Sequence, residues 1–205
     1  MLELDYDDVR ARLLKTRAVQ EQLQATWIWD QATLADWQAA VVSLDAARDA
    51  SQDAMATAQN ARSTVAAGLG ELHEATKQAL GIAKVAFRDQ PSKAGAFVGL
   101  TAVSKSFPAV SRSAQALSSA WQKADPAWVP LPGKTLAAYD VLRTKINGQQ
   151  AAAASAVSAQ KDVRRALQAA LKVQDRRAKD WYAVATRVFT SSTPEGQLLR
   201  AEIPT

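Results

Sequence analysis

The chain has 205 residues, of which 44 are alanine, with no cysteine and a formal net charge of +5. The absence of cysteine excludes disulfides, thiolate nucleophiles and thiolate metal sites. Alanine is accompanied by many Gln, Lys, Arg and Leu, which favour helices, whereas Gly and Pro number only 8 and 7. Runs of β-branched and aromatic residues with a period of two are absent, so we predict an all-α chain without strands.

Segments that contain tryptophan and proline divide the helix-forming sequence into the same four elements twice. Each set has a shorter helix, a connection with tryptophan, a long helical segment and a tail that follows a proline. The first set is expected at residues 5–26, 27–32, 33–89 and 90–101, and the second at 109–124, 125–134, 135–190 and 191–205.

The two sets are related by a repeat at an offset of 102 residues. A Thr-Leu-Ala motif at 33–35 recurs at 135–137, and the copies then align without a gap for 55 positions, eleven of them identical. We therefore predict a tandem duplication, with repeat units at 1–101 and 102–205 packed together as one domain. The expected fold is a helical bundle of long, alanine-rich antiparallel helices.

The long segments carry a seam of small and apolar residues with a spacing of four, three and four. Eleven residues complete three helical turns, so this spacing predicts a nearly straight packing surface that forms the bundle core. Whether each segment is one rod or a hairpin stays open, with turns conceivable near 45–49 and at Gly148. The seam occupies positions 50, 54, 57, 61, 65, 68, 72, 76, 79, 83 and 87, and the same positions plus 102.

The face opposite the seam differs between the copies. In the second copy it is basic, and the matching residues of the first copy are small or neutral apart from Glu74. We consider two interpretations: a face that is solvated or pairs with the acidic first repeat or another subunit, and a face that binds phosphate groups. The basic residues are Lys161, Arg165, Lys172, Arg176 and Arg187.

Six tryptophans form a second set of candidate contact residues. Trp27 and Trp29 lie in the first connection and Trp128 in the second. One interpretation is that tryptophans plug the ends of the bundle where alanine leaves gaps. The alternative is that Trp27, Trp29 and Trp128 belong to an exposed protein-binding patch.

No residue pattern points to catalysis, a metal or a cofactor. His73 is the only histidine, so a site with two histidines is excluded. In composition and pattern the chain resembles alanine-rich helical-bundle proteins of bacteria. We predict a non-enzymatic structural or protein-interaction bundle, with another protein or a second copy of itself as partner.

The alternative function is nucleic-acid or polyanion binding through the basic face. Residues 1–101 carry a net charge of −3 and residues 102–205 a net charge of +8, which offers a head-to-tail attraction between copies in a homo-oligomer. The acidic N-terminus has no apolar signal region, and no apolar run reaches 18 residues, so we expect a cytoplasmic protein without a transmembrane segment.

Overall fold

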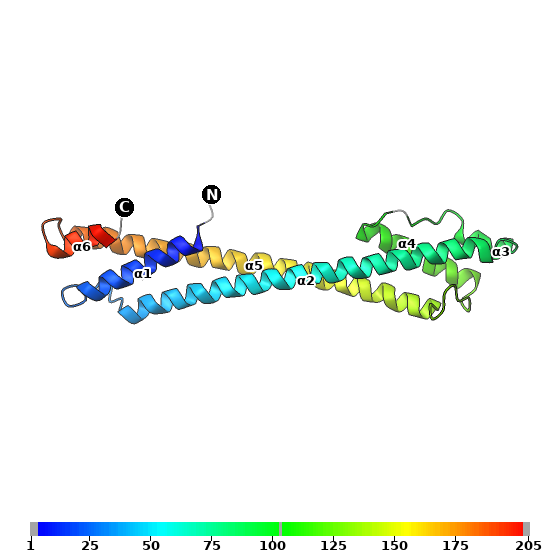
Figure 1. Ribbon diagram of the computed structural model, residues 1–205, viewed down its shortest axis with the longest axis horizontal. Helices are drawn as coiled ribbons and strands as arrows, with labels where there is room; N and C mark the ends of the chain where they lie inside the picture. The colour runs from blue at the N-terminus through cyan, green and yellow to red at the C-terminus, as the bar shows by residue number, and fades with distance from the viewer. Residues whose placement is uncertain (1–3, 103, 203–205) are drawn as a thin grey trace. The chain divides into compact units, whose positions relative to one another are not determined.

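The computed structural model describes residues 4–102 and 104–202, and this part of the chain is all-α, as predicted. Apart from an isolated bridge between Leu131 and Lys134, the described residues form no β-structure. The elements are α1 (Tyr6–Leu23), α2 (Leu34–Ala86), α3 (Pro91–Ala94), the 3-10 helix η1 (Gly95–Phe97), α4 (Phe107–Ala124), α5 (Leu136–Val188) and α6 (Pro194–Glu202) (Figure 1).

Both long helices begin directly after the threonine of a Thr-Leu-Ala motif. At the start of α2, Thr33 and Asp36 cap each other: the Thr33 amide donates to Asp36 Oδ2 over 2.7 Å, and the Asp36 amide donates to Thr33 Oγ1 over 3.3 Å. At the start of α5, Thr135 Oγ1 accepts the Ala138 amide over 3.2 Å. These bonds satisfy amides that have no partner inside the helix, so the recurring threonine marks the two helix starts.

Each long segment is a single helix of 53 residues. The chain does not turn at residues 45–49 or at Gly148, so each long segment is a rod and not a hairpin. A lone glycine in a helix costs only about 1 kcal/mol relative to alanine. The four alanines at 151–154, which follow Gly148, are the strongest helix formers and favour continuation of the helix past this position.

The chain divides into two compact units whose limits differ from those of the sequence repeats. Residues 1–56 and 158–205 form one unit, here called the terminal unit, and residues 57–157 form the other, here called the middle unit. Each unit contains a short helix and the start of a long helix from one repeat, together with the end of the long helix and the tail from the other. Each unit is therefore built from segments of both halves of the sequence.

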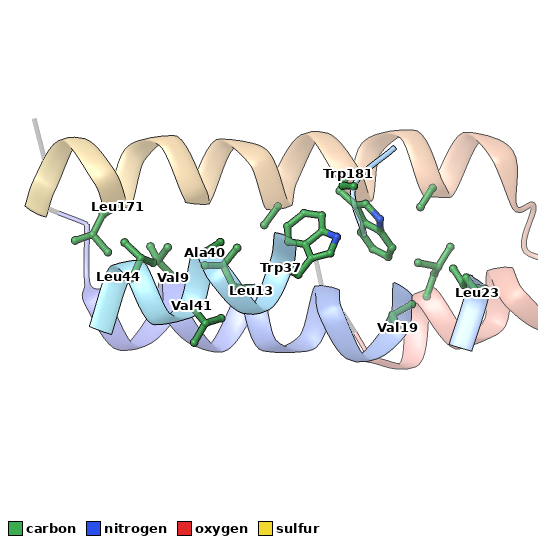
Figure 2. Packing of buried hydrophobic residues seen from close by; sticks show 14 residues of the cluster. Val9, Leu13, Val19, Leu23, Trp37, Ala40, Val41, Leu44, Leu171 and Trp181 are labelled. Carbon is green, nitrogen blue, oxygen red and sulfur yellow. The ribbon is translucent and has the colours of Figure 1, made fainter. Parts of the chain in front are cut away.

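In the terminal unit, α1 and α6 contact each other and cover the antiparallel parts of α2 and α5. Trp37, near the start of α2, packs against Trp181, near the end of α5. Leu44, farther along α2, lies beside Leu171, earlier in α5 (Figure 2). The core residues of this unit are Val9, Leu13, Val19, Leu23, Ala32, Trp37, Ala40, Val41, Leu44, Leu171, Ala178, Trp181, Ala185 and Leu199.

In the middle unit, α3, η1 and α4 pack together on the other parts of α2 and α5. Thr76 Oγ1 and Tyr139 Oη share a hydrogen bond of 2.7 Å between the two long helices. Gly68 lets α2 approach Ile146 of α5 so closely that a Cβ atom at position 68 would collide with the isoleucine. A larger residue at this seam position would therefore require the ends of the Ile146 and Gln149 side chains to move.

The seam predicted from the sequence describes the core only in part. From Val65 onward in α2, and around Ala178 to Ala185 in α5, its residues are buried or half-buried. Ala50, Thr57 and their counterparts at 152 and 159 are exposed, and the core there consists of Ala58 and Ala153 instead. Where neighbouring residues are nearly all small, the pattern of sizes does not reveal which side of the helix is buried.

Gly196 provides a test of how α6 is held. A Cβ atom at this position would collide with the backbone carbonyl of Thr190, and backbone cannot yield as a side chain can. We expect Gly196→Ala to lower the free energy of unfolding by roughly 1–3 kcal/mol. Gly70→Ala, on α2 with open space around it, should instead raise it by about 0.5–1 kcal/mol. Urea unfolding measures both variants, and equal effects would contradict this packing.

Candidate functional site

All five residues of the predicted basic face are exposed and belong to α5 within the terminal unit. The side chains of Arg165 and Arg176 are 79% and 84% exposed. The buried residues of the same stretch, among them Leu171, Ala178 and Trp181, lie on the other side of the helix. The structure therefore brings the predicted residues together as one row on the outer side of α5, called the basic row below.

Two carboxylates lie within the basic row. Arg165 pairs with Asp162 at 3.2 Å, and Arg176 pairs with Asp180 at 3.6 Å. All four side chains are at least half exposed, so each pair contributes at most about 1 kcal/mol. The pairs orient the guanidinium groups along the helix and leave them accessible to a partner.

Besides its exposed cations, α5 has a buried carboxylate that forms ion pairs within the terminal unit. Asp175 is almost fully buried and forms ion pairs with Arg12 of α1 and with Lys179 one turn along α5. In this ion pair α1 supplies the cation and α5 the acid, the reverse of the attraction that the net charges of the two halves suggest. This pairing fastens α1 to α5, and sequence charge alone did not indicate it.

The exchange of chain segments changes the predicted charge distribution. The acidic residues 1–56 pack with the basic residues 158–205, so the terminal unit has 14 Lys and Arg against 15 Asp and Glu. The middle unit has 11 Lys and Arg against 5 Asp and Glu. The basic row therefore lies in a unit that is nearly neutral as a whole, and its attraction for anions is local to α5.

The predicted contact residues Trp27 and Trp29 lie in one cluster of rings in the terminal unit. Trp27 contacts Trp181 and Phe189 with ring centres 5.9 and 5.8 Å apart, and Trp29 stacks on Trp37 at 6.5 Å. Gln20 fixes this cluster from α1 because its amide donates to the Trp27 carbonyl (2.9 Å) and accepts from Trp181 Nε1 (2.7 Å). Both connection tryptophans are half-buried.

Trp128 lies in a separate cluster in the middle unit. Its ring centre is 4.9 Å from that of Phe87 and 5.3 Å from that of Trp121. Trp121 Nε1 donates to the Trp128 carbonyl over 3.0 Å, so Trp121 holds this connection as Gln20 holds the first one. Trp128, which is half-buried, does not share a cluster with Trp27 and Trp29, and the contacts of all three support the interpretation that tryptophans plug the ends of a bundle.

The sequence interpretation missed a pocket in the middle unit, which Trp121 and Tyr139 line. The signal for it was present in the repeat alignment. At the offset of 102 residues, Ala75 aligns with Arg177 and Ala79 aligns with Trp181, so two large side chains of one copy are alanine in the other.

Within the described part of the chain, no three His, Cys, Asp or Glu residues are grouped so that they could hold a metal ion. In the same part, no helix is long and apolar enough to cross a membrane. Asp45, at the start of a row of carboxylates on α2, accepts hydrogen bonds from Arg10 Nε (2.8 Å) and from the Tyr6 hydroxyl of α1. This carboxylate ties two helices together.

The Asp45 contact predicts a pH-dependent stability. Hydrogen bonds from Arg10 and then Tyr6 hold the pKa of Asp45 below its ordinary value. The ionised carboxylate therefore stabilises the fold above the unfolded-state pKa of about 3.9, and this contribution is lost as the pH falls through the lower folded-state pKa. We expect Asp45→Asn to lower Tm at pH 7 by roughly 2–4 °C and to have little effect near pH 2.

Asp49→Asn, an exposed carboxylate one turn along the same helix, serves as the control and should change Tm little at either pH. Calorimetry at the two pH values measures the difference. A Tm decrease for Asp45→Asn that is the same at both would contradict the assigned contact.

Comparisons with known proteins return no relative for this chain. No family model, no curated protein and no solved structure matches it.

Proposed function

We propose that the chain is a non-enzymatic, protein-binding helical bundle and that the basic row of α5 binds an acidic surface of its partner. The observation that carries the proposal is the collection of five cations on the exposed side of one helix, opposite its buried side. The corresponding residues of α2 are Gln59, Ser63, Gly70, Glu74 and Val85, so this outer face is specific to one copy.

The size of the basic row suits a protein interface. From Lys161 to Arg187 it extends about 40 Å along the helix, at 1.5 Å per residue. A standard interface buries about 800 Å² on each partner, which a row of this length with its flanking residues is able to provide. Arginine, which the row contains three times, is enriched where interfaces hold their binding energy.

Two features favour a protein over a nucleic acid. Asp162 and Asp180 lie within the basic row, and a phosphate backbone that follows the row would be repelled at both points. Val173 and Val188 are exposed on the same stretch of helix, at 62% and 48%, and apolar side chains beside cations are usual in protein interfaces. Polyanion binding remains the second candidate because cations outnumber acids along the row.

We also propose that the two halves arose by tandem duplication. The support is that α2 and α5 have the same length at an offset of 102 residues, while α1 and α4 both have 18 residues. Buried pairs match in kind, as Trp37 does with Tyr139 and Leu44 with Ile146. A duplication that keeps the helix lengths and part of the core and changes an outer face is expected when one copy acquires a contact of its own.

A photo-crosslinking residue at Ala169 tests the basic row directly. Ala169 is exposed between Arg165 and Lys172, and its counterpart Ala67 is an exposed alanine on α2, so a crosslinker at Ala67 is a matched control. We expect the residue at position 169 to give a discrete protein adduct, with at least tenfold less from position 67. Arg165→Glu with Arg176→Glu should abolish the adduct, because two attractions become repulsions.

Lys77→Glu with Lys84→Glu makes the same change in charge on exposed residues of α2 and should leave the adduct intact. Equal adducts from positions 169 and 67, or an adduct that survives charge reversal, would contradict the proposal. Retention on heparin or on unrelated DNA duplexes that falls steeply with salt, and is lost on charge reversal, would establish the second candidate instead.

A further inference from the structure

The middle unit contains a pocket of about 250 Å³ that the proposed function does not use. It lies between the later part of α2 and the first turns of α5, and Trp121 of α4 reaches it from a third direction. Alanines 75 and 79 belong to the α2 side, and Pro130, Leu131, Gly133 and Lys134 of the second connection also line the pocket. The volume is close to the lower limit of small-molecule sites, so a ligand of one ring or two fused rings fits it.

The aromatic residues of the pocket have their polar atoms occupied. Trp121 and Tyr139 are almost fully buried, and their ring centres are 5.9 Å apart. The Tyr139 hydroxyl is bonded to Thr76, and the Trp121 indole N–H is bonded to the Trp128 carbonyl. Burial also raises the pKa of Tyr139 to about 12, so the phenol is neutral at physiological pH. Each of these rings therefore presents only a small area of ring carbon to the pocket, and most of the pocket's apolar surface comes from Ala75, Leu131 and Leu142, which are half-buried.

In the terminal unit, side chains fill the space that corresponds to the pocket. There the counterparts of Ala75 and Ala79 are Arg177 and Trp181. The Arg177 guanidinium lies 4.5 Å above the Trp37 ring, and Trp181 is fully buried beside Trp37 (Figure 2). A flat guanidinium and an indole thus pack at the position where the middle unit has only two methyl groups.

Part of the missing volume is replaced from α4. Trp121 stands where the terminal unit has Gln20, and it contacts Tyr139 and Trp128 much as Trp181 contacts Trp37 and Trp27. The counterpart of Arg177 has no such replacement, since Ala75 is only half-buried and lines the pocket. A planar group is therefore the shape that this position accommodates.

The charged residues of the pocket favour a negative charge on the ligand. Glu71, Lys134 and Lys145 are exposed residues of the lining, which gives an excess of one positive charge. The Glu71 carboxylate lies 4.0 Å from the Lys134 ammonium and is partly neutralised by it. An anionic group of a ligand that extends from the pocket toward solvent would meet two ammonium groups and one carboxylate that already pairs with Lys134.

We infer that the pocket of the middle unit binds a small planar aromatic carboxylate. Its ring packs against Ala75, Leu131 and Leu142, over the buried rings of Trp121 and Tyr139, and its carboxylate interacts with Lys134 and Lys145. This site shares no residue with the basic row, so either can fail without the other.

Isothermal titration with three probes of one ring system tests the inference: indole-3-carboxylate, neutral indole and cationic tryptamine. We expect saturable binding of the carboxylate with a Kd on the order of 0.1 mM, and weaker binding of indole. Tryptamine should bind most weakly. No saturable binding of the carboxylate up to several millimolar, or tighter binding of tryptamine, would overturn the inference.

Two pairs of variants locate the binding. Ala75→Arg introduces the side chain that fills the matching space in the terminal unit and should weaken the carboxylate at least tenfold. Ala67→Arg makes the same change at an exposed position of α2 and should have no effect. Circular dichroism and Tm show that both variants fold, and equal binding by the two would place the ligand elsewhere.

Lys145→Ala should weaken indole-3-carboxylate about two- to fivefold and leave neutral indole unchanged, because it removes charge and not ring contact. Lys123→Ala, an exposed lysine outside the pocket lining, is the control and should change neither probe. A loss for indole as large as that for the carboxylate would contradict the role assigned to the ammonium group.

Discussion

A helix of 53 residues has a buried side that must be covered along its length, and this requirement governs the structure. In each compact unit α2 and α5 run antiparallel and cover each other in part. Their remaining apolar surface is covered by a short helix and by the tail of the other half of the chain, α1 with α6 in the terminal unit and α4 with α3 and η1 in the middle unit. The short elements have no core of their own, and they fold because the long helices offer them one.

The packing of the two units illustrates how volume is conserved at different positions. In the terminal unit the central indole comes from α5 as Trp181, and α1 supplies the smaller Gln20 that binds it. In the middle unit the indole comes from the short helix as Trp121, and the long helix has Ala79. Close packing tolerates such exchanges when the total volume is kept. Where it is not kept, as at Ala75, a pocket results.

Charge has a different role between helices and along the basic row. The ion pairs of Arg12 with the buried Asp175 and of Arg10 with the partly exposed Asp45 connect α1 to the two long helices. In the basic row, Arg165 and Arg176 pair with acids of their own helix. The pairs of α1 connect different helices, whereas these two pairs lie on the exposed side of a single helix.

The sequence by itself determined the helices and their starts. Helix propensity, the spacing of apolar residues and the threonines at 33 and 135 are local signals that act over a few residues, so the elements and the exposed basic row of α5 were predictable. Only the tertiary structure decided which segments pack together, that Asp175 pairs with Arg12, and that a pocket forms beside Ala75. These features depend on side-chain volumes and charges that meet from segments more than 60 residues apart, and no local pattern encodes such a meeting.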